Sequence, residues 1–256
     1  MLKRVLLTFI LIFPLVILAH NNQVYQAGTI TALTNGQYDA SITLKELEKK
    51  GKFGLGTIDG AKGEMIIFDG KAYLSDITGQ AVPLKDNITV PFADVFSFKK
   101  PNINTDYENL SSEKILDDII NKKLSGPNYF YIFKITGKFS NIHARTIPPA
   151  KKGILLSDWI KDNQKFHDLK NVEGTLIGIY SPKYLSTITV PGFHLHFINK
   201  NKSEVYHVYS FDTKKVNLEV EKINDFTIML PNTKEYKDGK INDISHNTIS
   251  KMEESK

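Results

Sequence analysis

Three histidines at short, regular spacing are the residues of this sequence best suited to chemistry. His194, His196 and His207 fall within residues 192–208, where two arms of alternating apolar residues flank the polar tip Asn-Lys-Asn-Lys-Ser. That pattern is typical of a β-hairpin. With a two-residue turn at residues 201–202, counting outward along both arms places His196 directly opposite His207.

A hairpin of this register would gather all three imidazoles. Side chains alternate along a strand, so His194 and His196 share one face. Directly opposed residues have Cβ atoms about 5 Å apart, which brings His207 to the same patch. A divalent zinc ion needs such convergence, because its bonds to imidazole nitrogen are only ~2.0–2.1 Å long. The alternative is that these histidines are packed, hydrogen-bonded residues with a structural role; we favour metal binding.

Composition narrows the chemistry further. The chain has no cysteine, which excludes disulfides, a cysteine nucleophile and thiolate zinc ligands, so a metal site must use His, Asp or Glu. Arginine occurs only as Arg4 and Arg145 in a chain that otherwise uses lysine. The planar guanidinium binds a carboxylate with two parallel hydrogen bonds, which lysine cannot do. Arg145 is therefore a candidate site residue, although an isolated surface arginine would look the same in the sequence.

Residues 1–19 resemble a signal peptide. A charged start, Met-Leu-Lys-Arg, precedes an apolar run that ends in Ile-Leu-Ala before His20. We expect cleavage there and export to the periplasm or the extracellular space. An uncleaved anchor is the alternative, but the run is short for a membrane span of about 20 residues.

The positive charge of the chain is not concentrated in one segment. The net charge of +5 comes from lysines spread over all 256 residues. No basic run carries interleaved aromatic residues, so we expect no nucleic-acid binding.

The expected elements indicate an α+β protein. In the first half we expect a strand over 24–33, a hairpin over 64–74 with Asp-Gly at its turn, a helix over 111–124 and a strand over 129–142. A linker at residues 148–153 is the predicted subdomain boundary.

Beyond it we expect a short helix capped by Ser157. Strands follow at 174–180, 187–190, 215–222 and 226–230, besides the histidine hairpin. Their short connections predict a mainly antiparallel sheet or partly closed barrel. We therefore divide the chain into residues 20–148, residues 149–232 and a polar tail over 233–256, in which residues 249–254 carry a weak helical pattern.

Several motifs together resemble the acetolactate decarboxylases. The similarity runs from about residue 24 to residue 231. It includes Gly-Leu-Gly-Thr-Ile-Asp-Gly at 54–60, Gly-Glu at 63–64, Phe-Ser at 139–140, His-Ala-Arg-Thr at 143–146, Gly-Thr-Leu-Ile-Gly at 174–178, and Gly-Phe-His-Leu-His-Phe at 192–197 followed by His207. One departure is Tyr206, since similar proteins often carry glycine before the third histidine.

The resemblance implies a zinc enzyme that converts 2-acetolactate to acetoin with loss of CO2. It also implies two sheet-based α/β subdomains, with a mixed sheet on the N-terminal side and zinc facing their junction, and a homodimer. The implied site residues are the zinc ligands His194, His196 and His207, the catalytic Arg145, the acidic Glu64, the cavity residue Thr57, and a tail glutamate that returns to the site, Glu253 or its neighbour Glu254.

The chemistry of this reaction suits these residues. Departure of CO2 leaves electron density that the adjacent ketone accepts as an enediolate, and a Lewis acid stabilises that anion. No thiamine or pyridoxal cofactor is then needed. A glutamate must protonate the enediolate carbon, and the sequence does not choose between Glu64 and Glu253, which by position alone would be solvated residues.

The sequence leaves two other functions open. One is an exported metallohydrolase with zinc-activated water, and the other is a non-enzymatic β-rich binding module. Iron or manganese would also suit a three-histidine site.

Overall fold

The computed structural model describes residues 22–253 of the chain. The predicted signal peptide and Glu254 lie outside these residues. In chain order the elements are β1 (Gln23–Ala27), α1 (Ile30–Thr34), α2 (Leu44–Glu48), β2 (Phe53–Ile58), β3 (Lys62–Phe68), β4 (Lys71–Ser75), β5 (Ala81–Pro83), β6 (Phe92–Phe96), β7 (Ile103–Glu108), α3 (Ser112–Lys114), the π-helix η1 (Ile115–Ile120), β8 (Phe130–Thr146), α4 (Leu156–Asn163), β9 (Lys165–Ser181), the 3-10 helix η2 (Lys183–Leu185), β10 (Gly192–Asn199), β11 (Val205–Ile223), β12 (Asp225–Met229), α5 (Lys234–Asp238) and α6 (His246–Glu253).

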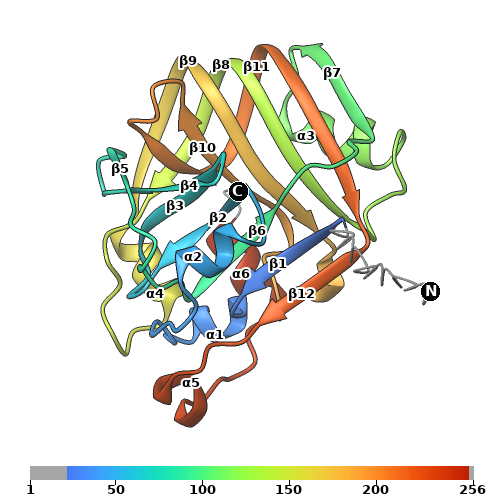
Figure 1. Cartoon of the computed structure of the whole chain (residues 1–256). Helices are drawn as coiled ribbons and strands as arrows, with labels where there is room; N and C mark the ends of the chain where they lie inside the picture. The colour runs from blue at the N-terminus through green and yellow to red at the C-terminus, as the bar shows by residue number, and fades with distance from the viewer. Residues whose placement is uncertain (1–21, 254–256) are drawn as a thin grey trace, which may run out of the picture.

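The described strands form two sheets, which confirms the predicted α+β class (Figure 1). The first sheet has the order β12-β1-β6-β2-β3-β4-β5 and is mixed, because β1 and β12 run parallel while its other pairs are antiparallel. The second sheet is antiparallel, with the order β10-β9-β8-β11-β7. Since β10 also pairs with β11, four of its strands close on themselves as a partial barrel.

The two sheets pack against each other through apolar side chains. One buried cluster joins Leu55 and Ile66 of the first sheet to Ile132, Ile177 and Ile198 of the second. Burial of such side chains is worth about 1.5–3 kcal/mol each, which makes the junction of the sheets a well-fixed part of the fold. Any residue placed at this junction therefore has a defined position.

The predicted histidine hairpin is present with the expected register. His196 lies opposite His207 across the β10–β11 pair. Leu195 and Phe197 point into the core of the partial barrel, so the alternating histidines point to the other face of β10, toward the first sheet. The turn is held by Asn199, whose side-chain oxygen accepts the backbone N–H of Ser203.

The chain does not pass from one sheet to the other at the predicted boundary near residue 148. Strands β7 and β8 precede that position but belong to the second sheet, whereas β12 follows it and belongs to the first. The chain therefore crosses between the sheets more than once.

Several predicted elements have different limits or types. The strand expected over 24–33 ends with β1, because Gly28 adopts a left-handed φ of +65° and Thr29 then caps α1. Ser111 caps a helix as expected, but that helix continues as the π-helix η1. Ser157 is not the cap, since α4 begins at Leu156 and its N-cap residue is Leu155. Residues 187–190 form no strand.

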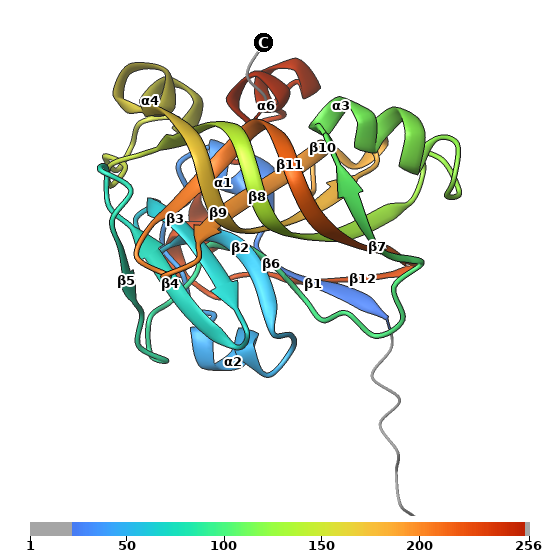
Figure 2. The same cartoon turned by 90° about the horizontal axis from the view of Figure 1, so that it is seen from above.

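Helices α1, α4 and α6 cover one end of the site. They contribute six buried side chains to one apolar cluster: Ile30, Leu33, Leu156, Ile160, Ile249 and Met252. Figure 2 shows α4 and α6 at the same edge of the long strands. Docking of α6 in this way brings the end of the described chain to the junction of the sheets. Between residues 22 and 253 the structure has no helix with the length and apolar character of a membrane span.

Candidate metal centre

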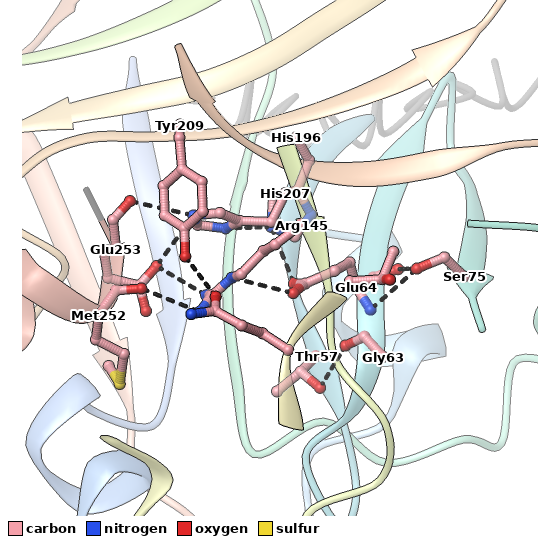
Figure 3. Close-up of polar contacts among 12 residues, drawn as sticks. Thr57, Gly63, Glu64, Ser75, Arg145, His196, His207, Tyr209, Met252 and Glu253 are labelled. Carbon is pink, nitrogen blue, oxygen red and sulfur yellow. Dashed lines mark hydrogen bonds and ion pairs between the residues drawn. The ribbon is translucent and has the colours of Figure 1, made fainter. Parts of the chain in front are cut away.

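The predicted site residues of the described chain lie together between the two sheets, and all of them except His196 line one cavity. Strand β2 contributes Thr57 and strand β3 contributes Glu64, both from the first sheet. The second sheet contributes Arg145 from β8 and the histidines of the hairpin, and α6 contributes Glu253 (Figure 3). The cavity has a volume of about 30 Å3, enough for one or two water molecules.

The three histidines form a group suited to a single ion. One ring nitrogen of each lies within 4.8 Å of one nitrogen of each other. Nδ1 of His207 is 3.3 Å from Nε2 of His196. Two ligands at ~2.0–2.1 Å from a tetrahedral ion would be separated by about that distance. The geometry of these residues therefore fits a metal.

Hydrogen bonds made by two of the rings decide which of their nitrogens would be left to bind an ion. Nδ1 of His196 donates to the carbonyl oxygen of Met65 at 2.8 Å, which leaves Nε2 free to bind. Nε2 of His207 donates to the carbonyl oxygen of Glu253 at 3.2 Å, which leaves Nδ1 of this ring free to bind. Backbone acceptors of this kind fix the tautomer and orientation of metal-binding imidazoles.

Electrostatics keep these two imidazoles neutral. Burial lowers the pKa of His196 and of His207 well below the ordinary value. The neighbouring His194 and Arg145 lower the pKa of both rings further. Neutral imidazole is the form that binds metals, so these histidines are prepared for a ligand role.

Arg145 is fully enclosed and contacts two carboxylates from distant parts of the chain. Its Nε lies 3.5 Å from Oε1 of Glu64, and its Nη2 lies 3.6 Å from Oε2 of Glu253. These are ion-pair distances, and Nε makes no hydrogen bond within the described residues. Nη1 donates to the carbonyl oxygen of Met252 at 3.0 Å. The guanidinium thus links both sheets to α6.

Glu64 is a buried acid, contrary to the solvated position expected from the sequence. Only 4% of the residue is exposed. Burial raises its pKa to about 7, with Arg145 opposing the rise and Glu253 adding to it. A carboxyl group with a pKa near neutrality can both hold and release a proton. Its Oε2 is 3.5 Å from Nε2 of His196, so this group faces the metal centre.

Thr57 and Glu253 occupy the cavity wall as predicted. The hydroxyl of Thr57 donates to the carbonyl oxygen of Gly63 at 3.0 Å, which ties β2 to the residue before Glu64. Glu253 is also buried rather than solvated. Its Oε2 lies 3.6 Å from Nε2 of His207, the nitrogen that bonds the Glu253 carbonyl.

Two further residues of the site escaped the sequence analysis. Tyr209 packs against Arg145, with its ring centroid 5.6 Å from the guanidinium carbon, and donates to the side chain of Gln164. Asp94 is buried within β6, and its Oδ2 lies 3.7 Å from Nδ1 of His194. Period-two alternation from His207 could have indicated Tyr209, and a lone acid in Phe-Ala-Asp-Val-Phe could have indicated Asp94.

Comparisons with known proteins agree with these motifs. A family model described as Alpha-acetolactate decarboxylase matches residues 24–243. Alpha-acetolactate decarboxylase of Brevibacillus brevis is 35% identical over 235 residues, 92% of this chain and 82% of that protein. Its counterpart in Methanosarcina mazei is 34% identical over 230 residues, 90% and 79% of the two chains. The X-ray structure of alpha-acetolactate decarboxylase from Bacillus subtilis strain 168 has a TM-score of 0.85 at 30% identity, covering 91% of this chain and 100% of that one.

The histidine group predicts stoichiometric metal binding. Purified protein should bind about one divalent ion per chain, and His194→Ala should lose most of it, because one of three ligands is removed. Elemental analysis after dialysis measures the content. His143→Ala is the matched control, since His143 pairs with Asp168 and is not part of the histidine group. Equal metal content in both variants would contradict the site.

The raised pKa of Glu64 predicts a pH-dependent stability in chelator-treated protein. A carboxyl group whose pKa rises from 4.5 to about 7 on folding stabilises the fold below pH 4.5 and loses that contribution as the pH rises through 7. Urea unfolding should therefore show wild type losing stability relative to Glu64→Gln between these values. A constant difference between the two proteins would show that Glu64 is ionised throughout.

Proposed function

The chain belongs to the alpha-acetolactate decarboxylase family of carboxy-lyases, and we propose that it converts 2-acetolactate to acetoin and CO2 with zinc as its metal. The observation that carries this proposal is a group of three buried histidines beside one cavity, which is lined by His194, His207, Arg145, Glu64 and Glu253. Nearly the whole described chain is similar to relatives that bear this name. That similarity favours the decarboxylase over the hydrolase and the binding module.

His194, His196 and His207 would hold the zinc ion, which supplies a Lewis acid for the electron density left on the substrate when CO2 departs. Three neutral imidazoles leave the charge of a divalent ion uncompensated and its remaining positions open to the substrate. The same three ligands would accept iron or manganese, so metal identity is part of the test.

Arg145 would bind the carboxylate of the substrate. A guanidinium in a cavity with little water forms strong paired hydrogen bonds with a carboxylate. Its Nε is buried and makes no hydrogen bond to any residue from 22 to 253, so this donor is available to a ligand. The contact would orient the carbon–carbon bond that breaks.

Glu64 would deliver the proton that completes the reaction. The carbon that loses CO2 must gain a proton, and a donor with a pKa of about 7 holds one at neutral pH. We assign the role to Glu64 rather than Glu253 because Glu64 faces Nε2 of His196, a ligand nitrogen. Glu253 then serves to hold Arg145 and to close the cavity wall.

Two wider features of the protein also remain proposals. We propose that the protein acts after export, with residues 1–19 removed, because the leader has the composition of a signal peptide. We propose that it forms a homodimer, as the family resemblance implies.

An assay with 2-acetolactate tests the function directly. Zinc-loaded protein should release CO2 and form acetoin, and removal of the metal by a chelator should abolish this activity, with recovery on adding zinc back. Parallel addition of iron or manganese identifies the metal that supports turnover. Folded, metal-loaded protein that forms no acetoin would refute the proposal.

Arg145→Lys tests the role of the guanidinium fork. The substitution keeps the charge but loses the paired donors, so kcat/KM should fall by about 100-fold or more. Metal content and melting temperature show whether the variant is otherwise intact. Lys152→Arg, at an exposed ion pair with Asp39 and Glu235, is the matched control and should keep normal activity. Near-normal turnover by Arg145→Lys would contradict this role.

A further inference from the structure

Asp94 is a buried carboxylate behind the metal centre. It lies in the middle of β6, opposite Gln26 on β1 and Leu55 on β2, so its backbone is held by a neighbouring strand on each side. No part of the residue is exposed. Neither carboxyl oxygen has a hydrogen-bond partner among residues 22–253. Burial of an unpaired carboxylate is costly, so its presence in the sheet requires an explanation.

The opposed residue on β1 does not satisfy Asp94. The side-chain nitrogen of Gln26 donates to the carbonyl oxygens of Gly28 at 2.8 Å and Ile188 at 2.9 Å. An amide nitrogen has only two hydrogens, so Gln26 has no N–H left to donate to the carboxylate.

The imidazole nitrogen that faces Asp94 also lacks a hydrogen-bond partner among the described residues. Nδ1 of His194 lies 3.7 Å from Oδ2 of Asp94 and makes no hydrogen bond to the described part of the chain. The His194 ring also packs against Phe92 of the same strand, with ring centroids 6.2 Å apart. Strand β6 thus faces His194 with both an apolar contact and a carboxylate.

The other two ligands show what is missing at His194. Each directs one ring nitrogen away from the metal centre to a nearby acceptor: the Met65 carbonyl for His196 and the Glu253 carbonyl for His207. Among residues 22–253, Nδ1 of His194 has no such acceptor within hydrogen-bond distance. A shift of a few tenths of an ångström would bring Asp94 within hydrogen-bond distance of its Nδ1.

We propose that Asp94 is a positioning residue that accepts the N–H of His194 Nδ1 and so presents Nε2 of His194 to the metal. This inference rests on the proposed metal centre. A carboxylate in this place fixes the tautomer, orients the ring and makes its other nitrogen a stronger ligand.

A purely structural carboxylate in this fold has different surroundings. Glu221 is also buried, but its two oxygens accept the backbone N–H groups of Lys99 at 2.7 Å and Lys100 at 3.1 Å. Loss of Glu221 removes bonds that the fold itself uses, whereas loss of Asp94 removes none. The two residues therefore form a matched pair for an experiment.

The test compares Asp94→Leu, Asp94→Asn and the control Glu221→Gln in the full chain. Zinc affinity is measured by competition with a chromophoric chelator. The visible spectrum of the cobalt-substituted protein reports the geometry of the ligands. Stability is measured as the melting temperature with and without zinc. We expect Asp94→Leu to bind zinc about 10- to 100-fold more weakly. Asp94→Asn, which keeps an acceptor oxygen without the charge, should lie between this variant and wild type.

The stability of the metal-free protein gives an independent readout. Removal of an unpaired buried carboxylate should leave the melting temperature of metal-free Asp94→Leu equal to or above that of wild type, while the increase on adding zinc becomes smaller. Glu221→Gln should melt lower in both states and bind zinc normally.

Unchanged zinc affinity and an unchanged cobalt spectrum in folded Asp94→Leu would overturn the role of Asp94. If that variant does not fold, the same criteria applied to Asp94→Asn decide the question. Failure of wild type to bind zinc would instead refute the metal centre itself, so the two failures are distinguishable.

Discussion

Arg145 and its two carboxylates are the interaction on which the arrangement of this site depends. A buried guanidinium is costly unless anionic partners and hydrogen-bond acceptors surround it. The interaction joins three separate elements, since Glu64 lies on β3, Arg145 on β8, and Glu253 with the Met252 carbonyl on α6. The charge is therefore stable only when the two sheets and the last helix are assembled, which couples formation of the site to formation of the whole fold.

The candidate metal centre is likewise built from residues of several elements. The hairpin supplies all three imidazoles at a fixed register. The atoms behind the rings come from elsewhere: the Met65 carbonyl from β3, the Glu253 carbonyl from α6 and, in our proposal, Asp94 from β6. Each ring is thus fixed by a different neighbour. Such a site is rigid because independent elements would have to move together to distort it.

The hairpin and Arg145 could be found in the sequence because local patterns specify them. Alternation and turn residues set the register of His196 and His207, and the rarity of arginine singled out Arg145. The burial of Glu64 and Glu253 depends instead on the packing of one sheet against another and on docking of α6, which no local window contains. The prediction from sequence position alone, that both glutamates are exposed to solvent, was therefore wrong.

The same limit explains the errors in the elements. Strand β9 spans Lys165–Ser181, yet only residues 174–180 were expected, because its first half is polar and is held by pairing with β8. The placement of β7 and β8 in the second sheet and of β12 in the first likewise depends on pairing between residues far apart in the sequence. The prolines near residue 148 mark a loop, which is not the place where one sheet ends and the other begins.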